Sequence, residues 1–216
     1  MEIIDYLKAV NGTSANYYTL WPVKKPRAIV QIITGMSDYI DRYDHFAHFL
    51  NQQNILVIGH DHFGQGKAVL KRNDLGNLIP QTQISTPTPE IVTRSKNVSL
   101  ACRQFYPEIP LIILGHSLGS LVVTELLKED HELYQAAILI GIINLLSVAK
   151  LFAPAIKSFQ SLESTRLTRE LNQKAYNVFN QDFQSGEKFG WVTNNPMVRK
   201  QLELDPLVGY DYTLAS

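Results

Sequence analysis

The residues best suited to chemistry lie together in the stretch LIILGHSLGSLVV, residues 111–123. Its centre, GHSLG, matches the pattern G-x-S-x-G, with Ser117 in the middle. Strand-like apolar residues precede this pattern, and a helical pattern follows it at once. A serine on such a tight strand-to-helix turn is held in a strained backbone conformation with its hydroxyl exposed. The pattern therefore predicts that Ser117 is a nucleophile.

An attacking serine needs hydrogen-bond donors for the oxyanion that forms in the reaction. Leu118, the residue after the nucleophile, is expected to supply one backbone N–H, and the N-terminus of the following helix adds partial positive charge. The stretch ITGMSDY, residues 33–39, begins where another strand is expected to end. The backbone N–H of Met36 is therefore the predicted second donor.

The serine also needs a base that takes its proton. His116 is its neighbour in the sequence. Neighbouring side chains on such a turn point in different directions, so the imidazole would not align with the serine hydroxyl. We therefore do not expect His116 to be the base, and we interpret it as a histidine packed beside the end of the strand.

These residues must be positioned by a scaffold in which strands and helices alternate. Apolar and β-branched runs predict strands, and apolar residues at helical spacing predict helices. The predicted strands are 17–23, 27–34, 54–61, 111–115 and 136–141, and the predicted helices are 42–53, 90–106 and 120–130. Alternation in units of roughly 25 residues is typical of a mostly parallel sheet flanked by helices. The predicted fold class is therefore α/β.

Residues 142–212 depart from this rhythm. Apolar residues spaced three or four apart form one helical stripe: Leu145, Ala149, Phe152, Ile156 and Phe159. Asn195-Pro196 is expected to begin a further helix, and Asp205-Pro206 to end it. We expect an α/β core in residues 1–141 and a helical cap inserted at 142–212.

The composition is that of an ordinary soluble globular protein, with 45% hydrophobic and 19% charged residues. Lys+Arg and Asp+Glu balance at 20 each, so no basic surplus would attract nucleic acid. The single cysteine, Cys102, excludes an internal disulfide and is typical of a reducing cytoplasm. The N-terminus lacks the pattern of a signal peptide. Gly141, Asn144 and Lys150 interrupt the apolar region 136–156, so no transmembrane span is expected.

Two other stretches could suggest a phosphate or metal site. DHFGQG, residues 61–66, fails the spacing of a phosphate loop, and Lys67 is followed by Ala68. We interpret it as a loop that shapes the site. The two histidines and the aspartate at 60–62 would point to alternating sides of a strand end, so no metal site is predicted. No G-x-G-x-x-G follows the first strand, so neither a dinucleotide nor any other cofactor is expected.

Taken in order, the motifs resemble those of the α/β-hydrolase superfamily, and within it the monoacylglycerol lipase and lysophospholipase-like group. ITGMSDY stands where those proteins carry H-G-x-x-E-H, and DHFGQG stands where they carry D-x-R-G-H-G. GHSLG aligns with their nucleophile elbow, and DPLVGYDYT, residues 205–213, looks like the segment that closes their cap. The resemblance extends over essentially all 216 residues.

The chain departs from the family motifs at several positions. Thr34 replaces the first histidine of the first motif, and Asp38-Tyr39 replaces its Glu-His pair. Phe63 and Gln65 replace the arginine and the histidine of the second motif. These departures affect loop packing and substrate contacts more than an oxyanion hole that is made of backbone N–H groups.

The resemblance implies a serine esterase or lipase that cleaves carboxylic esters of lipids through an acyl-enzyme. In this family the triad follows the chain order Ser, then Asp or Glu, then His. All histidines of this chain precede Tyr134: His45, His48, His60, His62, His116 and His131. Asp182, Asp205 and Asp211 are interpreted as solvated or capping residues. The triad acid and histidine, and the last two strands of the fold, are therefore expected to be absent from this chain.

Two hypotheses remain open at this point. The chain is either the nucleophile-bearing part of a lipid esterase, or a catalytically incomplete fragment or non-enzymatic remnant. In both cases the strand at 136–141 would be left as a sheet edge without its neighbour. We expect that edge to bind a complementary C-terminal segment or to cause self-association.

Overall fold

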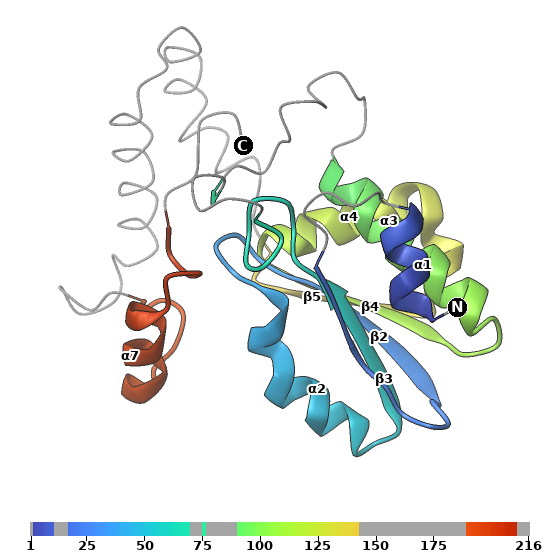
Figure 1. Cartoon of the computed structure of the whole chain (residues 1–216), viewed down its shortest axis with the longest axis horizontal. Coiled ribbons are helices and arrows are strands. Elements are labelled where there is room, and N and C mark those ends of the chain that lie inside the picture. Colours follow the sequence, from blue (N-terminus) through green and yellow to red (C-terminus); the bar gives the residue numbers. More distant parts are fainter. Residues whose placement is uncertain (1, 11–16, 70–74, 77–89, 143–188, 211–216) are drawn as a thin grey trace, which may run out of the picture.

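The computed structural model describes residues 2–10, 17–69, 75–76, 90–142 and 189–210. Their centre is a five-stranded sheet in the order β1-β3-β2-β4-β5 (Figure 1). Its strands are β1 (Tyr18–Trp21), β2 (Ala28–Ile33), β3 (Ile55–His60), β4 (Leu111–His116) and β5 (Ala136–Ile140). β1 runs antiparallel to β3, and the other neighbouring strands are parallel. This arrangement confirms the predicted α/β class.

Helices flank the sheet on both faces (Figure 1). One face carries α1 (Ile3–Val10), α3 (Glu90–Phe105) and α4 (Leu118–Asp130), and the other carries α2 (Asp44–Asn51). Two short 3₁₀ helices, η1 (Ile40–Tyr43) and η3 (His131–Leu133), precede α2 and follow α4. The predicted helices 42–53, 90–106 and 120–130 are thus confirmed, with ends shifted by a few residues.

The central strands are apolar because helices cover both of their faces. β2 is buried along its whole length, and β3 is buried beyond its first residue. Ile29 and Ile58 pack in the cluster beneath α1 and α3. Val30 and Val57 point to the other face and pack in the cluster that contains Ala47 of α2. The predicted strand at 54–61, buried on both faces, is therefore confirmed.

β5 is paired but poorly covered. It runs parallel to β4, from the pair Ile112–Ala136 to the pair His116–Ile140. All of its residues except Leu139 are exposed. The predicted strand at 136–141 is confirmed, but its side chains are not buried as those of β2 and β3 are.

α1 was not predicted from the sequence. It places Ile3 and Leu7, one helical turn apart, in a core cluster with Val98 and Cys102 of α3. Burial raises the pKa of the Cys102 thiol to about 12, so the thiol stays protonated. The i, i+4 spacing of Ile3 and Leu7 was the available signal for this helix.

α7 (Pro196–Leu204) confirms the predicted helix ends. Asn195 precedes it, and its side-chain oxygen accepts a hydrogen bond from the N–H of Met197 at 3.0 Å. The helix stops before Asp205, as the Asp205-Pro206 pair predicted. Several residues singled out in the sequence lie outside the described ranges: Leu145, Ala149, Phe152, Ile156, Phe159, Asp182 and Asp211.

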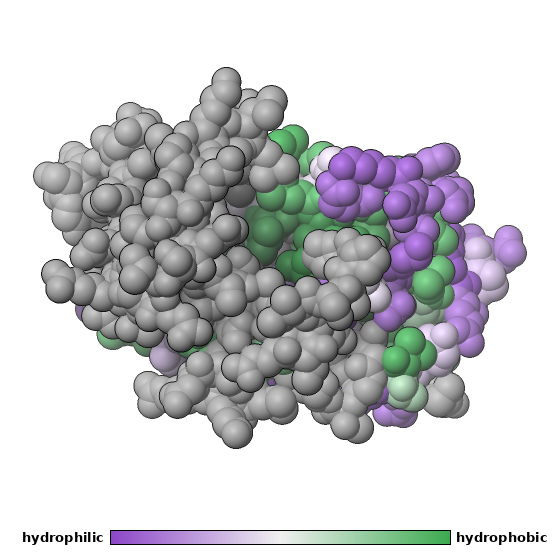
Figure 2. Space-filling view, turned by 90° about the horizontal axis from the view of Figure 1, so that it is seen from above, coloured by the Kyte–Doolittle hydropathy of each residue, from purple (hydrophilic) through white to green (hydrophobic). Residues whose placement is uncertain are grey.

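Hydrophobic residues also reach the surface. In the view from above, hydrophobic residues gather in the middle of the visible face, and hydrophilic residues lie beside them (Figure 2). Large exposed hydrophobic side chains in the described ranges include Met36, Phe49, Ile138, Ile140 and Met197. None of the helices described combines the length and the hydropathy needed to cross a membrane.

Candidate active site

Ser117 lies at a sharp turn between β4 and α4. Its φ of 53° and ψ of −114° are values that residues other than glycine rarely adopt. Gly119 lets the turn approach β2, because a Cβ there would lie 2.1 Å from the carbonyl oxygen of Ile33. A Cβ on Gly115 would lie 2.4 Å from the carbonyl oxygen of Gly119. The strand–turn–helix context predicted around Ser117 is present, and its role as nucleophile stays a prediction.

Hydrogen bonds tie this turn to the end of β5. The N–H of Ser117 donates to the carbonyl oxygen of Ile140 at 2.8 Å, and the hydroxyl of Ser120 donates to the same oxygen at 2.9 Å. The N–H of Ser117 is therefore occupied. Leu118 is the first residue of α4, so its N–H has no acceptor within the helix. Leu118 stays the predicted oxyanion donor on this side.

The loop after β2 brings the second predicted donor close to the serine. A Cβ on Gly35 would lie only 3.3 Å from the Cβ of Ser117, so the two backbones are in close contact. Met36 is the next residue, and Ser37 follows with a φ of 54°, so the chain turns sharply here. The structure thus brings the loop of Met36 to Ser117, while the oxyanion role of Met36 stays a prediction.

A cavity of about 110 Å³ lies beside this turn. One wall is mostly polar and comes from the core. The other wall is apolar. The first is lined by Met36, Ser37, Asp38, Arg42 and His116, and the second by Phe189, Trp191, Val192, Leu202, Val208 and Gly209. All residues of the apolar wall belong to the predicted cap. A cavity with two such walls suits an amphipathic molecule. Small-molecule sites usually measure about 300 Å³ or more, so this cavity is too small to enclose a whole ligand of that kind.

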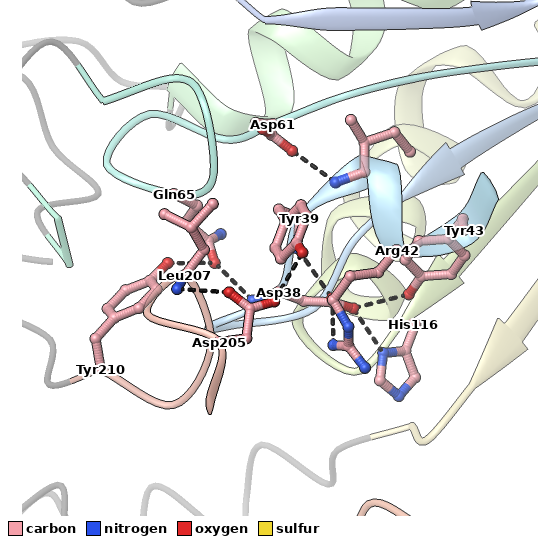
Figure 3. Close-up of polar contacts among 11 residues, drawn as sticks. Asp38, Tyr39, Arg42, Tyr43, Asp61, Gln65, His116, Asp205, Leu207 and Tyr210 are labelled. Atoms are coloured by element: carbon pink, nitrogen blue, oxygen red, sulfur yellow. Dashed lines mark hydrogen bonds and ion pairs between the residues drawn. The ribbon is translucent and has the colours of Figure 1, made fainter. Parts of the chain in front are cut away.

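Asp38 is the centre of the polar wall (Figure 3). Its carboxylate accepts hydrogen bonds from Arg42 Nη1 at 2.6 Å and from the Tyr43 hydroxyl at 3.0 Å. Burial, and next the charge of Asp38, raise the pKa of Tyr43 far above its ordinary value, so this hydroxyl stays protonated. Nδ1 of His116 lies 3.9 Å from Oδ2 of Asp38, which is beyond hydrogen-bond distance. His116 is therefore directed towards Asp38.

The position of His116 agrees with the prediction in part. It lies at the end of β4, as a packed histidine would, but it also lines the cavity, which the sequence did not indicate. Asp38 lies in the loop that carries Met36, and Arg42 lies four residues later in η1; this spacing was the available signal for a polar wall. All six histidines lie in the described ranges, and none of them is hydrogen-bonded to Ser117.

A second set of hydrogen bonds joins the segment after α7 to the loops around the site (Figure 3). The Tyr39 hydroxyl donates to Asp205 at 2.7 Å, and burial together with this carboxylate raises the pKa of Tyr39 to about 12. Gln65 Oε1 accepts from the N–H of Asp38 at 3.3 Å and from the Tyr210 hydroxyl at 3.2 Å. Asp205 ends α7, as the capping interpretation predicted. Tyr39 and Gln65, two positions that depart from the family motifs, thus hold this segment against the site.

The DHFGQG loop shapes the site, in agreement with its interpretation from the sequence. The buried carboxylate of Asp61 accepts hydrogen bonds from the N–H of Ile40 at 2.6 Å and the N–H of Lys67 at 2.7 Å. His60 and His62 are buried beside it, with ring centroids 5.1 Å apart. Within the described ranges no group of three side chains could hold a metal ion.

These buried groups predict how stability depends on pH. Burial lowers the pKa of His62 to about 4 and that of His60 well below 6.5, so the unfolded chain binds more protons there. Their contribution to the free energy of unfolding is therefore lost as the pH falls from 6.5 towards about 4. Burial raises the pKa of Asp61 to about 7, so its contribution has the opposite sign and is lost as the pH rises through 7. Between about pH 6.5 and pH 4 the two histidines outweigh the one aspartate, so the free energy of unfolding should decrease steadily as the pH is lowered.

Urea unfolding at a series of pH values would measure this slope. His62→Gln should flatten it, because it removes one histidine proton from the balance. Asp61→Asn should steepen it, because it removes the opposing group. His131→Gln alters an exposed histidine and should leave the slope unchanged. A slope that neither His62→Gln nor Asp61→Asn alters would show that other groups control the pH dependence.

Related chains are known from a virus and a mammal. The monoglyceride lipase homolog of Monkeypox virus is 28% identical over 129 residues, which are 58% of this chain and 42% of that protein. The monoglyceride lipase of Mus musculus is 27% identical over 120 residues, which are 56% of this chain and 36% of that protein. The matched region therefore spans less than half the length of each relative.

The same fold is present in a solved bacterial enzyme. A thermostable carboxyl esterase from Bacillus coagulans, in complex with glycerol, has a TM-score of 0.78 at 19% identity, over 93% of this chain and 64% of that one. This likeness concerns the fold alone. The family model described as serine aminopeptidase, S33, matches residues 24–215. Because this match covers most of the chain, the protein belongs to the serine aminopeptidase S33 family of α/β-hydrolases, in its monoacylglycerol lipase-like group.

Proposed function

We propose that this chain carries the nucleophile and the oxyanion hole of a serine hydrolase that cleaves carboxylic esters of lipids. The observation that carries this proposal is the φ of 53° at Ser117, on a turn that Gly115 and Gly119 allow to pack closely. Backbone strain of this kind tends to occur at functional positions. The family and the names of the relatives, a monoglyceride lipase and a carboxyl esterase, support an ester substrate.

In the proposed reaction, Oγ of Ser117 attacks the carbonyl carbon of the ester. The carbonyl oxygen becomes negatively charged and accepts hydrogen bonds from the N–H groups of Met36 and Leu118, close to the N-terminus of α4. The bond between the carbonyl carbon and the alcohol oxygen then breaks. The alcohol leaves with a proton, and an acyl-enzyme remains. Water hydrolyses this intermediate and releases the carboxylic acid and free Ser117.

We propose that the base in this reaction is none of the six histidines of the chain. A base must come within about 2.6–3.2 Å of the hydroxyl, directly or through one water. His116 is not hydrogen-bonded to Ser117, and its Nδ1 lies 3.9 Å from Oδ2 of Asp38. His60 and His62 are buried, and their lowered pKa values make them poor proton acceptors. Efficient turnover therefore requires a proton acceptor that these positions do not supply.

We also propose that residues 142–212 form a cap on a core made by residues 1–141. The described part of this cap supplies the apolar wall of the cavity. Gly209 has a φ of 66°, and a Cβ there would lie 2.4 Å from the ring of Phe189, so the backbone packs directly on that ring. The hydrogen bonds of Tyr39 and Gln65 hold the same segment on the core. The cap would thus cover the acyl chain of a substrate.

Binding of uncleavable lipids tests the proposed substrate class. Trp191 lies in the apolar wall, so its fluorescence should change when monoalkyl glycerol ethers are titrated into the protein. Long-chain ethers should bind more tightly than short ones, because each CH₂ group that becomes buried contributes about 0.8 kcal/mol. The measurement is a set of fluorescence titrations with ethers of increasing chain length.

Two lysine variants make this measurement specific. Val208→Lys places a charge in the apolar wall and should weaken the binding of long chains. Leu204→Lys alters an exposed side chain of α7 and should not. Trp191→Phe should remove the signal, because the other tryptophan, Trp21, lies away from the cavity with its indole N–H bound to Asp44. Equal affinities for short and long chains would contradict a lipid substrate.

A further inference from the structure

The loop that carries the predicted oxyanion donor is fixed by the core at its two ends. This oxyanion loop, residues 34–39, connects β2 to η1. Near its start, Gly35 lies against the turn of the nucleophile, where an added Cβ would be 3.3 Å from the Cβ of Ser117. Just after its end, the N–H of Ile40 donates to the buried carboxylate of Asp61 at 2.6 Å. The contacts of the residues in between therefore determine where the N–H of the donor points.

One of these residues, Tyr39, is bound to the cap (Figure 3). Its hydroxyl donates to Oδ2 of Asp205 at 2.7 Å. The other oxygen of that carboxylate accepts a hydrogen bond from the N–H of Leu207 at 2.9 Å. Asp205 is therefore itself held within residues 205–210, the stretch after α7 that we call the cap segment. Tyr39 joins the oxyanion loop to a fixed point of this segment.

A second connection runs through Gln65 to the main chain of the oxyanion loop (Figure 3). Gln65 Oε1 accepts hydrogen bonds from the N–H of Asp38 at 3.3 Å and from the hydroxyl of Tyr210 at 3.2 Å. Gln65 is fully buried, so water does not readily replace a partner that is lost. The Tyr210 hydroxyl therefore keeps this oxygen where the N–H of Asp38, two residues after Met36, reaches it.

We propose that the cap segment positions the N–H of Met36 for the oxyanion, and that Tyr39, Gln65 and Tyr210 are positioning residues. The inference rests on the proposed function, because it concerns a donor of that site. An oxyanion donor is effective only within about 2.7–3.1 Å of the charge that develops, so a loop that moves loses part of its effect. The cap thus controls the rate of the reaction itself, in addition to covering the lipid.

The cap segment also contributes to the cavity, which links lipid binding to the oxyanion loop. Val208 and Gly209 line the apolar wall. A lipid chain that packs on this wall restricts the cap segment, and the two hydrogen-bonded connections restrict the oxyanion loop in turn. A region that one ligand has already ordered costs less to order in a later step. Long-chain ligands should therefore react faster once they are bound, and not only bind more tightly.

Hydrogen–deuterium exchange measures the state of the loop without any catalytic step. Tyr210→Phe removes the hydroxyl that binds Gln65 and changes no residue of the loop. Peptides that cover residues 34–39 should exchange about two- to tenfold faster in this variant, the change expected for the loss of one hydrogen bond. Tyr134→Phe is the matched control, because its hydroxyl is hydrogen-bonded to Ser99 of α3 at 2.7 Å, and it should leave exchange in the loop unchanged. A long-chain monoalkyl glycerol ether should slow exchange of the same peptides in the unmodified chain.

The kinetics of labelling by a fluorophosphonate probe measure the effect on the site. Saturation with the probe separates its binding from the maximal rate of reaction. Tyr39→Phe and Tyr210→Phe should each lower the maximal rate about tenfold, which is part of the 10²–10³-fold cost of losing an oxyanion donor. The probe concentration that gives half the maximal rate should stay the same. Burial raises the pKa of Tyr39 to about 12, so its hydroxyl still donates in mildly alkaline labelling buffer.

Two outcomes would overturn the proposal. The first is exchange in the oxyanion loop that Tyr210→Phe leaves unchanged, or that Tyr134→Phe accelerates equally. The second is a labelling defect confined to the half-maximal concentration, which would show that the cap segment only holds the probe. Failure of the proposed function looks different. Ser117 of the unmodified chain would then not react at all, whereas the exchange experiment would still decide whether the cap segment positions the loop.

Discussion

Replacing Ser117 by alanine is expected to abolish labelling of the chain by a fluorophosphonate probe. The probe forms a bond with the serine oxygen and resembles the tetrahedral intermediate, so it needs both the hydroxyl and the oxyanion donors. Because no histidine is hydrogen-bonded to Ser117, labelling should be slow at neutral pH and faster in mildly alkaline buffer, where hydroxide removes the proton. Gel fluorescence would measure the rate, and mass spectrometry of the peptides would locate the adduct.

Ser37→Ala is the matched control for this experiment. Ser37 has a similar φ of 54° and lines the cavity, but it is separated from β2 and from η1 by several loop residues, whereas Ser117 directly joins β4 and α4. Its replacement should leave the adduct on Ser117, and heat-denatured protein should not react. Labelling that persists in Ser117→Ala, or an adduct on another serine, would contradict the assignment of the nucleophile.

Turnover of a p-nitrophenyl ester by the purified chain should be about 10⁶-fold below that of a serine hydrolase with a complete triad. Positioning and oxyanion donors alone leave about 10³ to 10⁴-fold acceleration over water. The physical reason is that none of the six histidines, His116 included, is hydrogen-bonded to Ser117. The rate should rise with hydroxide concentration and show no inflection that reports a titrating histidine.

His116→Gln tests the imidazole that is closest in sequence to the nucleophile. Loss of a general base usually costs about 10² to 10⁴-fold, whereas here the turnover should change little. His131→Gln, beyond the end of α4, serves as the control variant. If His116→Gln lowered turnover as much as Ser117→Ala, then His116 would be the base. Asp38, at 3.9 Å, would then be the acid that orients it.

The surroundings of Ser117 could be predicted from the sequence because they depend on residues that are neighbours in the chain. An apolar run, two glycines and a helical pattern suffice to indicate the turn, and the structure has β4, the turn and α4 in that order. α7 was predicted for the same reason, since Asn195 caps it and Pro196 begins it. The mostly parallel sheet follows from the alternation of strand and helix patterns.

The walls of the cavity could not be predicted in this way. Tyr39 and Asp205 are 166 residues apart, and Gln65 and Tyr210 are 145 apart. A hydrogen bond between such residues leaves no periodicity in the sequence. It forms only when the loops after β2 and β3 and the segment after α7 meet in space. The same holds for His116, whose direction towards Asp38 depends on the packing of two loops.

For β5, the formation of the strand could be predicted from the sequence, whereas its burial depends on the tertiary structure. AAILIG has the apolar pattern of a buried parallel strand, and by itself it determined that a strand forms beside β4. The pattern does not contain the elements that would cover that strand. Burial depends on what packs against a face: α2 covers Val57, whereas no described element covers Ile138. The formation of the strand therefore depends on its own residues, and the solvent exposure of its side chains depends on which other elements pack against it.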